Sequence, residues 1–217
     1  ELEAVYQDNV SLSASLDFAA MSQRALKNTA LSLLSASPNE RAVLLAKQQF
    51  ESAVNMTDSH AALSVLVNSG YELAAQEAST AFYNKWHTDA QVLEQWFSVQ
   101  SGSSSYMNLE GLRKIIALPD FDMTNPNKVR AVIGVFCQQN LVNFHNESGE
   151  AYVFLADYII KLDDLNPQIA SRLVMPLTRW RKFNENRQGL MIAQLKRIHG
   201  KNNLSKDVRE IVEKSLP

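Results

Sequence analysis

Two stretches of the sequence begin in the same way: residues 125–136 read Asn-Pro-Asn-Lys-Val-Arg-Ala-Val-Ile-Gly-Val-Phe, and residues 166–177 read Asn-Pro-Gln-Ile-Ala-Ser-Arg-Leu-Val-Met-Pro-Leu. In each, Asn can cap a helix through its side-chain oxygen, and Pro takes the first helical position, where its missing N–H group costs nothing. Apolar residues follow at steps of three and four, the spacing of one helix face. Both stretches are therefore predicted to begin a helix, and Pro176 is expected to kink or end the second one.

The distance between the two starts indicates how the helices are arranged. It is 41 residues, and helix pairs that repeat at about 40 to 47 residues are typical of HEAT- and armadillo-like solenoids. Residues 152–160 have the pattern of a return helix, and residues 190–198 and 208–216 continue the stack. Two copies alone do not establish a repeat, but they favour an α-α superhelix of stacked helix pairs.

The rest of the chain has the same helical spacing. Helices are predicted at about 13–35, 39–55, 71–87, 90–100 and 109–118, with another between the second and the third that ends near residue 70. The first carries Leu16, Leu26, Ala30 and Leu33 among its apolar residues, and Val43, Leu44, Lys47 and Phe50 mark one face of the second. No stretch alternates apolar and polar residues as a half-buried strand does. The fold class is therefore all-α, in a single domain over residues 1–217.

The composition of the chain limits both the class of protein and the kinds of partner that can be expected. With 46% hydrophobic and 20% charged residues, the chain has the composition of a folded globular protein, and it lacks a run of about 18 apolar residues. Its 21 Lys and Arg against 23 Asp and Glu form no long cluster of one sign. Neither a membrane nor a nucleic acid is therefore expected as a partner.

The cysteine count and the N-terminus bear on the compartment. Cys137 is the only cysteine of the sequence and has no partner for an intramolecular disulfide, and the first residues have no signal-peptide pattern. A cytoplasmic location is therefore expected. Because the chain begins at Glu1 and not at a methionine, we also expect it to be a piece of a longer protein. The order of residues 1–12 is left open.

No catalytic or metal constellation is found. The four histidines, at positions 60, 87, 145 and 199, are at least 27 residues apart, so no zinc-ligand spacing occurs. Gly-x-Ser-x-Gly, P-loop and Gly-x-Gly-x-x-Gly motifs are absent. Cys137 fits a buried small apolar residue better than a nucleophile, and the aromatic residues around Trp86 and Trp96 fit core packing better than a cage. We therefore expect no catalytic residue, metal ligand or cofactor in this chain.

Three residues near the helix starts are candidates for binding. Gln168 and Arg172 lie four residues apart and so share one face, and Gln168 is in the first turn, where free N–H groups favour an anion or a peptide carbonyl. Arg130 occupies a comparable position after Pro126. If the two helices stack in parallel, both guanidinium groups project from one rim, where they can bind carboxylates or carbonyls in a bidentate way. Alternatively, both arginines pair with local acids or cap neighbouring carbonyls.

A short basic run, Arg179-Trp180-Arg181-Lys182, has two interpretations. It can contact phosphate, or it can form a solvated helix face on which the aliphatic stems cover Trp180. Because the run is only four residues long, the second interpretation is favoured.

Several strings also carry a resemblance to a known family. They are Lys-Gln-Gln-Phe at 47–50, Asn-Met-Thr-Asp at 55–58, Lys-Trp-His at 85–87, Gln-Trp-Phe at 95–97, Thr-Asn-Pro-Asn-Lys-Val-Arg at 124–130, Phe-His at 144–145 and Asn-Pro-Gln-Ile-Ala-Ser-Arg-Leu at 166–173. In this order, over nearly the whole chain, they resemble the C-terminal domain of the bacterial aminopeptidase N family of zinc metallo-aminopeptidases. The resemblance implies a helical, armadillo-like superhelix that closes over a thermolysin-like catalytic domain and leaves a restricted passage to the zinc.

The resemblance also implies where the chemistry takes place. The family's His-Glu-x-x-His zinc site and its Gly-Ala-Met-Glu-Asn segment belong to the catalytic domain and do not occur here. The chain alone is therefore expected to be inactive, its partners being that catalytic domain of the same polypeptide, with its zinc, and the peptide substrate. By the same resemblance, Gln168 borders the pocket for the first residue of the peptide, and Arg130 and Arg172 lie near the peptide beyond the scissile bond.

Two functions follow as alternatives. The first is a non-catalytic cap that closes the active-site chamber of a zinc aminopeptidase and helps to select and position the peptide. The second is a free-standing helical-repeat scaffold that binds a protein or peptide in its groove. A His-Glu-x-x-His segment encoded upstream of Glu1 would distinguish the first from the second.

Overall fold

The computed structural model describes residues 1–11 and 14–217, which contain helices and no strand. The chain divides into two compact units, Glu1–Tyr106 and Met107–Pro217. Helices of repeat proteins pack mainly on their neighbours in sequence, so compact sub-units are natural in such a fold. The all-α prediction is confirmed, and the single domain over 1–217 remains a prediction.

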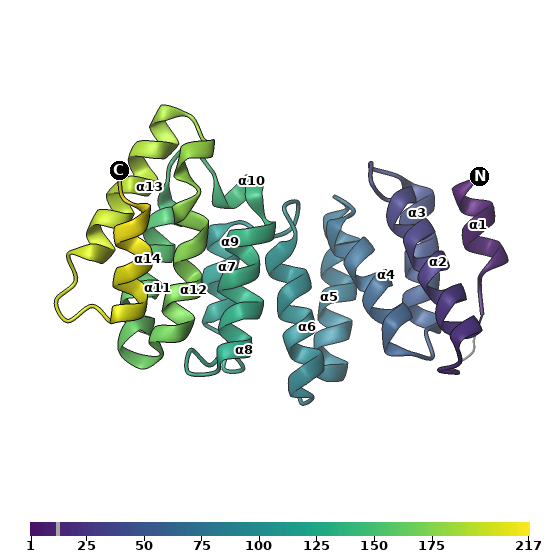
Figure 1. Cartoon of the computed structure of the whole chain (residues 1–217). Coiled ribbons are helices and arrows are strands. Elements are labelled where there is room, and N and C mark those ends of the chain that lie inside the picture. Colours follow the sequence, from purple (N-terminus) through teal and green to yellow (C-terminus); the bar gives the residue numbers. More distant parts are fainter. Residues whose placement is uncertain (12–13) are drawn as a thin grey trace. The chain divides into compact units, whose positions relative to one another are not determined.

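The helices of each unit follow one another along the chain (Figure 1). In the first unit they are α1 (Leu2–Asp8), α2 (Phe18–Leu34), α3 (Glu40–Ser52), α4 (Met56–Asn68), α5 (Glu72–Trp86) and α6 (Ala90–Gly102). In the second they are α7 (Leu109–Ile116), α8 (Pro126–Val129), the π-helix η1 (Arg130–Gly134), α9 (Val135–Gln139), α10 (Leu141–Phe144), α11 (Glu150–Leu165), α12 (Pro167–Thr178), the 3-10 helix η2 (Trp180–Lys182), α13 (Glu185–His199) and α14 (Lys206–Ser215).

The two predicted Asn-Pro helix starts are confirmed. The Asn125 side chain accepts hydrogen bonds from the backbone N–H groups of Asn127 and Lys128, and α8 begins at Pro126. The Asn166 side chain accepts one from the backbone N–H of residue 169 at 3.2 Å, and α12 begins at Pro167. Pro176 lies inside α12, which continues for two further residues and ends at Thr178.

The buried faces of α2 and α3 share only Ala30 of α2 with the predicted ones. In α2 the residues at positions 16, 26 and 33 are exposed or precede the helix, and the buried residues are Arg24, Lys27, Ala30 and Leu31. In α3 the buried residues are Ala42, Leu45, Ala46 and Gln49, and Leu44 is exposed. The face that is buried depends on what the neighbouring helices offer, and here it includes charged and amide groups.

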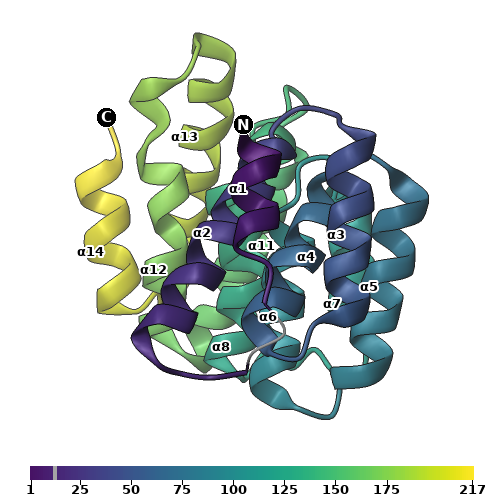
Figure 2. The same ribbon diagram turned by 90° about the vertical axis from the view of Figure 1, so that its right-hand side faces the viewer.

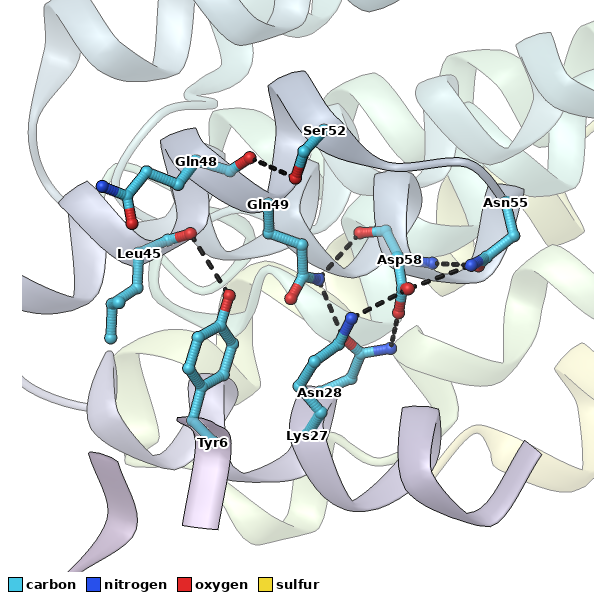
Figure 3. Close-up of polar contacts among 9 residues, drawn as sticks. All are labelled: Tyr6, Lys27, Asn28, Leu45, Gln48, Gln49, Ser52, Asn55 and Asp58. Carbon is cyan, nitrogen blue, oxygen red and sulfur yellow. Dashed lines mark hydrogen bonds and ion pairs between the residues drawn. The ribbon is translucent and has the colours of Figure 1, made fainter. Parts of the chain in front are cut away.

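A buried polar cluster joins three helices of the first unit (Figure 3). Lys27 of α2 and Asp58 of α4 form an ion pair at 2.8 Å, with each side chain only 4% exposed. The Asn28 amide donates to the Asp58 carboxylate at 3.0 Å, and the Gln49 amide of α3 donates to the side-chain oxygen of Asn28 at 2.8 Å. Buried polar groups need such partners, so the cluster specifies how α2, α3 and α4 pack.

The N-terminal residues fold onto the same unit. Within the stretch 1–12, whose order the sequence leaves open, α1 forms, and position 12 lies outside the described residues. Tyr6 is buried, and its hydroxyl donates to the Leu45 carbonyl of α3 at 3.5 Å (Figure 3). This aromatic side chain anchors α1.

The second unit packs α11 to α14 around an apolar core. In Figures 1 and 2, α14 lies beside α12. The indole N–H of Trp180 donates to the Ser215 carbonyl at 2.8 Å and so ties η2 to the end of α14. Phe136, Phe144 and Tyr152 are fully buried and pack edge to face, which links α9, α10 and α11. This core supports one face of α12 and leaves the other exposed.

Candidate functional site

An exposed row of side chains runs along α12 and is here named the α12 stripe. It consists of Gln168, Arg172, Met175 and Arg179, which follow one another at steps of four, three and four residues. Residues at these steps lie on one face of a helix. The opposite face, with Ile169, Leu173 and Leu177 among others, is buried in the core. The prediction that Gln168 and Arg172 share one face is therefore confirmed, and that face is open.

The guanidinium groups of Arg130 and Arg172 have no protein partner in the part of the chain that the structure describes. Within residues 1–11 and 14–217 neither side chain forms an ion pair or a hydrogen bond, and both residues are exposed. The described structure therefore contradicts the alternative interpretation, in which both arginines pair with local acids or cap neighbouring carbonyls. Each keeps the five N–H donors of its planar group for a ligand.

Arg130 begins the π-helix η1, between α8 and α9. In a π-helix the hydrogen bonds skip one more residue than in an α-helix, and such turns often occur at functional sites. A Cβ atom built on Gly134 lies 3.6 Å from Arg130 Cγ and 3.9 Å from Leu173 Cδ2. Gly134 thus lies next to the aliphatic part of Arg130 and next to Leu173 of α12, which follows Arg172 in the sequence. The two candidate arginines are carried on adjacent segments of one unit.

A cavity of about 550 Å³ adjoins the second half of the α12 stripe. Its lining residues come from α9, α10, α12, η2 and α13: Cys137, Gln138, Leu141, Val142, His145, Met175, Pro176, Arg179, Lys182, Phe183 and Arg187. Apolar groups make up much of this lining, and its charged groups are all basic. We call it the α9–α13 cavity.

His145 and Arg187 form a connected wall of this cavity. The Arg187 Nε atom donates to the His145 carbonyl at 2.7 Å, and the His145 ring stacks on Phe183 with 4.1 Å between centroids. Tyr152 and His145 share a hydrogen bond of 2.8 Å between the hydroxyl and Nδ1. Burial and the Arg187 charge lower the pKa of His145 to about 4. The imidazole is therefore neutral near pH 7, and the positive charge of the cavity comes from the arginines and the lysine.

The basic run divides between two roles. The Arg181 guanidinium lies over the Trp180 ring at 4.0 Å from its centroid, so a charged group covers the indole, where the sequence predicted aliphatic stems. Arg179 and Lys182 line the α9–α13 cavity instead. Sequence reasoning missed this cavity, although the basic run was its signal, because the other lining segments are far apart in the sequence.

The remaining candidates of the sequence are structural. Tyr83 packs on Trp96 at 4.9 Å between ring centroids, and the Trp96 indole donates to the Ser79 carbonyl at 3.1 Å, so the aromatic cluster is packed and does not form an open cage. Burial raises the pKa of the Cys137 thiol well above its usual value. In the described part of the chain, no three His, Cys, Asp or Glu side chains are grouped so that they can hold a metal ion.

Comparison with known proteins identifies the family. Over residues 1–217 the chain matches the family model described as "Domain of unknown function (DUF3458_C) ARM repeats". The chain belongs to this family. The DUF3458_C match agrees with the predicted armadillo-like stacking of helix pairs.

Relatives of this DUF3458_C domain occur in aminopeptidases. Aminopeptidase N of Caulobacter vibrioides is 41% identical over 205 residues, which is 93% of this chain and 23% of that protein. Aminopeptidase N of Escherichia coli is 36% identical over 217 residues, 100% of this chain and 25% of that protein. The chain therefore spans about a quarter of the length of these curated relatives.

A solved structure shows the same relation. The crystal structure of Legionella pneumophila aminopeptidase A in complex with aspartic acid superposes with a TM-score of 0.84 at 33% identity, over 98% of this chain and 26% of that one. The resemblance to the C-terminal domain of the aminopeptidase N family is confirmed. None of the described helices combines the length and the apolar content that crossing a membrane requires.

Proposed function

We propose that this chain is the non-catalytic cap domain of a zinc aminopeptidase that removes N-terminal residues from peptides. In this proposal the zinc and the catalytic residues belong to another part of the same polypeptide, in the cytoplasm of a bacterium. The cap closes the active-site chamber and helps to select and position the peptide. The similarity to bacterial aminopeptidases over the whole chain supports this context.

The observation that carries the proposal is that Gln168, Arg172 and Arg130 are exposed and that both guanidinium groups lack a protein partner within the described residues. An exposed guanidinium with no protein partner can donate two parallel hydrogen bonds to a carboxylate, or single ones to peptide carbonyls. The Gln168 amide can both donate and accept, which suits the main chain of a peptide. We assign Gln168 to the first residue of the peptide and the two arginines to the residues beyond the scissile bond.

Positioning of this kind acts on the rate without any bond-making by the cap. A peptide held along α12 presents its N-terminal residue to the zinc in one orientation, and correct orientation removes entropy from the activation barrier. A closed chamber also excludes folded proteins while admitting peptides and unfolded chain ends. The cap then determines which substrates reach the zinc, and the catalytic domain performs the hydrolysis.

The test is the variant Arg172→Ala in the complete enzyme, measured on a peptide and on a small chromogenic amide. Loss of a charged hydrogen bond costs about 1.5–3 kcal/mol, so kcat/KM for the peptide is expected to fall about tenfold or more. The small amide does not reach Arg172 and should be turned over almost normally.

Arg181→Ala is the matched control, since the Arg181 guanidinium lies over Trp180 and outside the α12 stripe. It should leave both kcat/KM values close to those of the parent enzyme. Equal loss on both substrates in Arg172→Ala contradicts direct peptide contact. No loss on either one removes the peptide-positioning role of this face.

A further inference from the structure

We propose that the α9–α13 cavity is a binding site for a carboxylate carried on an apolar group. This site is separate from the contacts of Gln168, Arg172 and Arg130, and it does not depend on the zinc of the proposed enzyme. Three features of the cavity carry the inference: its size, its apolar walls and the excess of basic side chains in its lining.

The size and the walls fit a small apolar body. A volume of about 550 Å³ lies within the roughly 300–1,000 Å³ of typical small-molecule sites. Leu141, Val142 and Met175 line the cavity and are exposed, with Val142 72% accessible. Pro176 and Phe183 complete the apolar lining. A ligand that covers these side chains removes apolar surface from water, which is the main driving force of such binding.

The charged side chains that line the cavity are all basic. Arg179, Lys182 and Arg187 line the cavity, and no Asp or Glu does. Arg179 and Lys182 form no ion pair or side-chain hydrogen bond within the described residues. Arg187 is held in place through its Nε bond to the His145 carbonyl, and its one ion pair, with the exposed Glu147, is long at 3.7 Å. Three basic side chains therefore surround one small volume.

These features select the charge of the ligand. A carboxylate accepts hydrogen bonds from guanidinium and ammonium groups and compensates their charge. A primary amine finds no acidic partner here and is repelled. The apolar walls disfavour a polyanion, which would have to give up its water against Leu141 and Val142. The favoured ligand is therefore an apolar residue that ends in a carboxylate and has no positive charge nearby.

This chemistry has two sources: the C-terminal residue of a peptide and a free aryl or alkyl carboxylate. The experiment uses N-acetyl-L-phenylalanine for the first and 4-phenylbutyrate for the second, with N-acetyl-L-phenylalanine amide as the uncharged analogue. Binding to the full chain is measured by calorimetry and by chemical-shift changes near residues 141–142 and 175–187. We expect the carboxylates to bind at least about tenfold more tightly than the amide. Binding of both acids indicates a general carboxylate site, and binding of the N-acetyl amino acid alone indicates peptide ends.

Variants localise the site and distinguish it from the proposed function. Arg179→Gln combined with Lys182→Gln should weaken carboxylate binding about tenfold or more, while Arg181→Gln, in the same run, should leave it unchanged. Arg172→Ala should also leave it unchanged, because Arg172 does not line the cavity. Circular dichroism confirms that each variant is folded. Equal affinity for acid and amide, no binding in the millimolar range, or no effect of the double substitution would overturn the proposal.

Discussion

Replacing Lys27 by Met is expected to destabilise the first unit by about 3 kcal/mol. The Lys27 ammonium and the Asp58 carboxylate are 2.8 Å apart, and each is 4% exposed. Removal of one partner from a buried ion pair costs about 3–5 kcal/mol, because the other charge stays buried. The cost of Lys27→Met is expected at the lower end of this range, because the Asn28 and Asn55 amides still donate to the Asp58 carboxylate at 3.0 Å each. Asp58→Asn leaves the ammonium without an acid and should cost about 4 kcal/mol.

The assay is urea unfolding of the full chain at pH 7, followed by circular dichroism and by hydrogen exchange of the amides in α2 and α4. The double variant Lys27→Met/Asp58→Asn should be more stable than the sum of the two losses predicts, by about 2 kcal/mol, because it leaves no unpaired charge. Lys47→Met is the control: its ion pair with Glu77 is 41% and 56% exposed, so the loss should stay below about 1 kcal/mol.

Acid should weaken the same cluster in a defined direction. Burial raises the pKa of Asp58, but the hydrogen bonds from Lys27, Asn55 and Asn28 together lower it by more than burial raises it. The net pKa is therefore below the usual 3.8. The stability contributed by this carboxylate is therefore complete above its usual pKa and is lost as the pH falls through the lowered value.

The buried-charge argument would be refuted if Lys27→Met and Asp58→Asn each cost less than about 1 kcal/mol at pH 7, or if the losses in the double variant were strictly additive.

Two further predictions concern the second unit. Burial and the Arg187 charge lower the pKa of His145 from 6.5 to about 4. The stability that the neutral imidazole contributes is therefore complete above pH 6.5 and declines as the pH falls towards 4. After allowance for solvent screening, the free energy of unfolding should decline by about 1–2 kcal/mol. Urea unfolding at several pH values should show this slope in the parent chain and a shallower one in His145→Gln, in which the lowered pKa of His60 still contributes; an unchanged slope contradicts the assignment. Gly149 has a φ of +69°, and a Cβ built there lies 2.8 Å from Leu190 Cδ1, so Gly149→Ala should cost about 2 kcal/mol in calorimetric unfolding. Gly189→Ala is its control, since no other part of the described chain comes within 4 Å of a Cβ at that position, and it should stabilise α13 slightly.

The positions of the helices could be predicted because their signals are local. Asn125 and Asn166 cap the helices that follow them within three residues, so a short stretch of sequence contains the whole interaction. The buried face of α2 could not be predicted in this way. Lys27 is buried because its partner Asp58, 31 residues later, neutralises it, and a polar residue at a core position otherwise indicates an exposed face.

The candidate site could likewise be predicted from the sequence only where its signals are local. The shared face of Gln168 and Arg172 follows from helical spacing, and the structure has it exposed. The α9–α13 cavity depends on the packing of α9 and α10 against α12 and α13, which no local pattern contains. The π-helix was also missed, because its hydrogen bonding has no characteristic residue pattern of the kind that Asn-Pro gives a helix start.

The π-helix has a consequence for insertions and deletions. One residue turns an α-helix by about 100°, so the extra residue in η1 sets the rotation of everything after it relative to Arg130. Deletion of one residue from 131–133 is expected to restore α-helical hydrogen bonding here, although it also removes a buried side chain. It would also rotate Cys137 and Gln138 away from the cavity wall, or turn Arg130 off the exposed surface. The length of this segment therefore sets the orientation of Arg130 relative to the cavity wall, and a chain one residue shorter here is expected to change it.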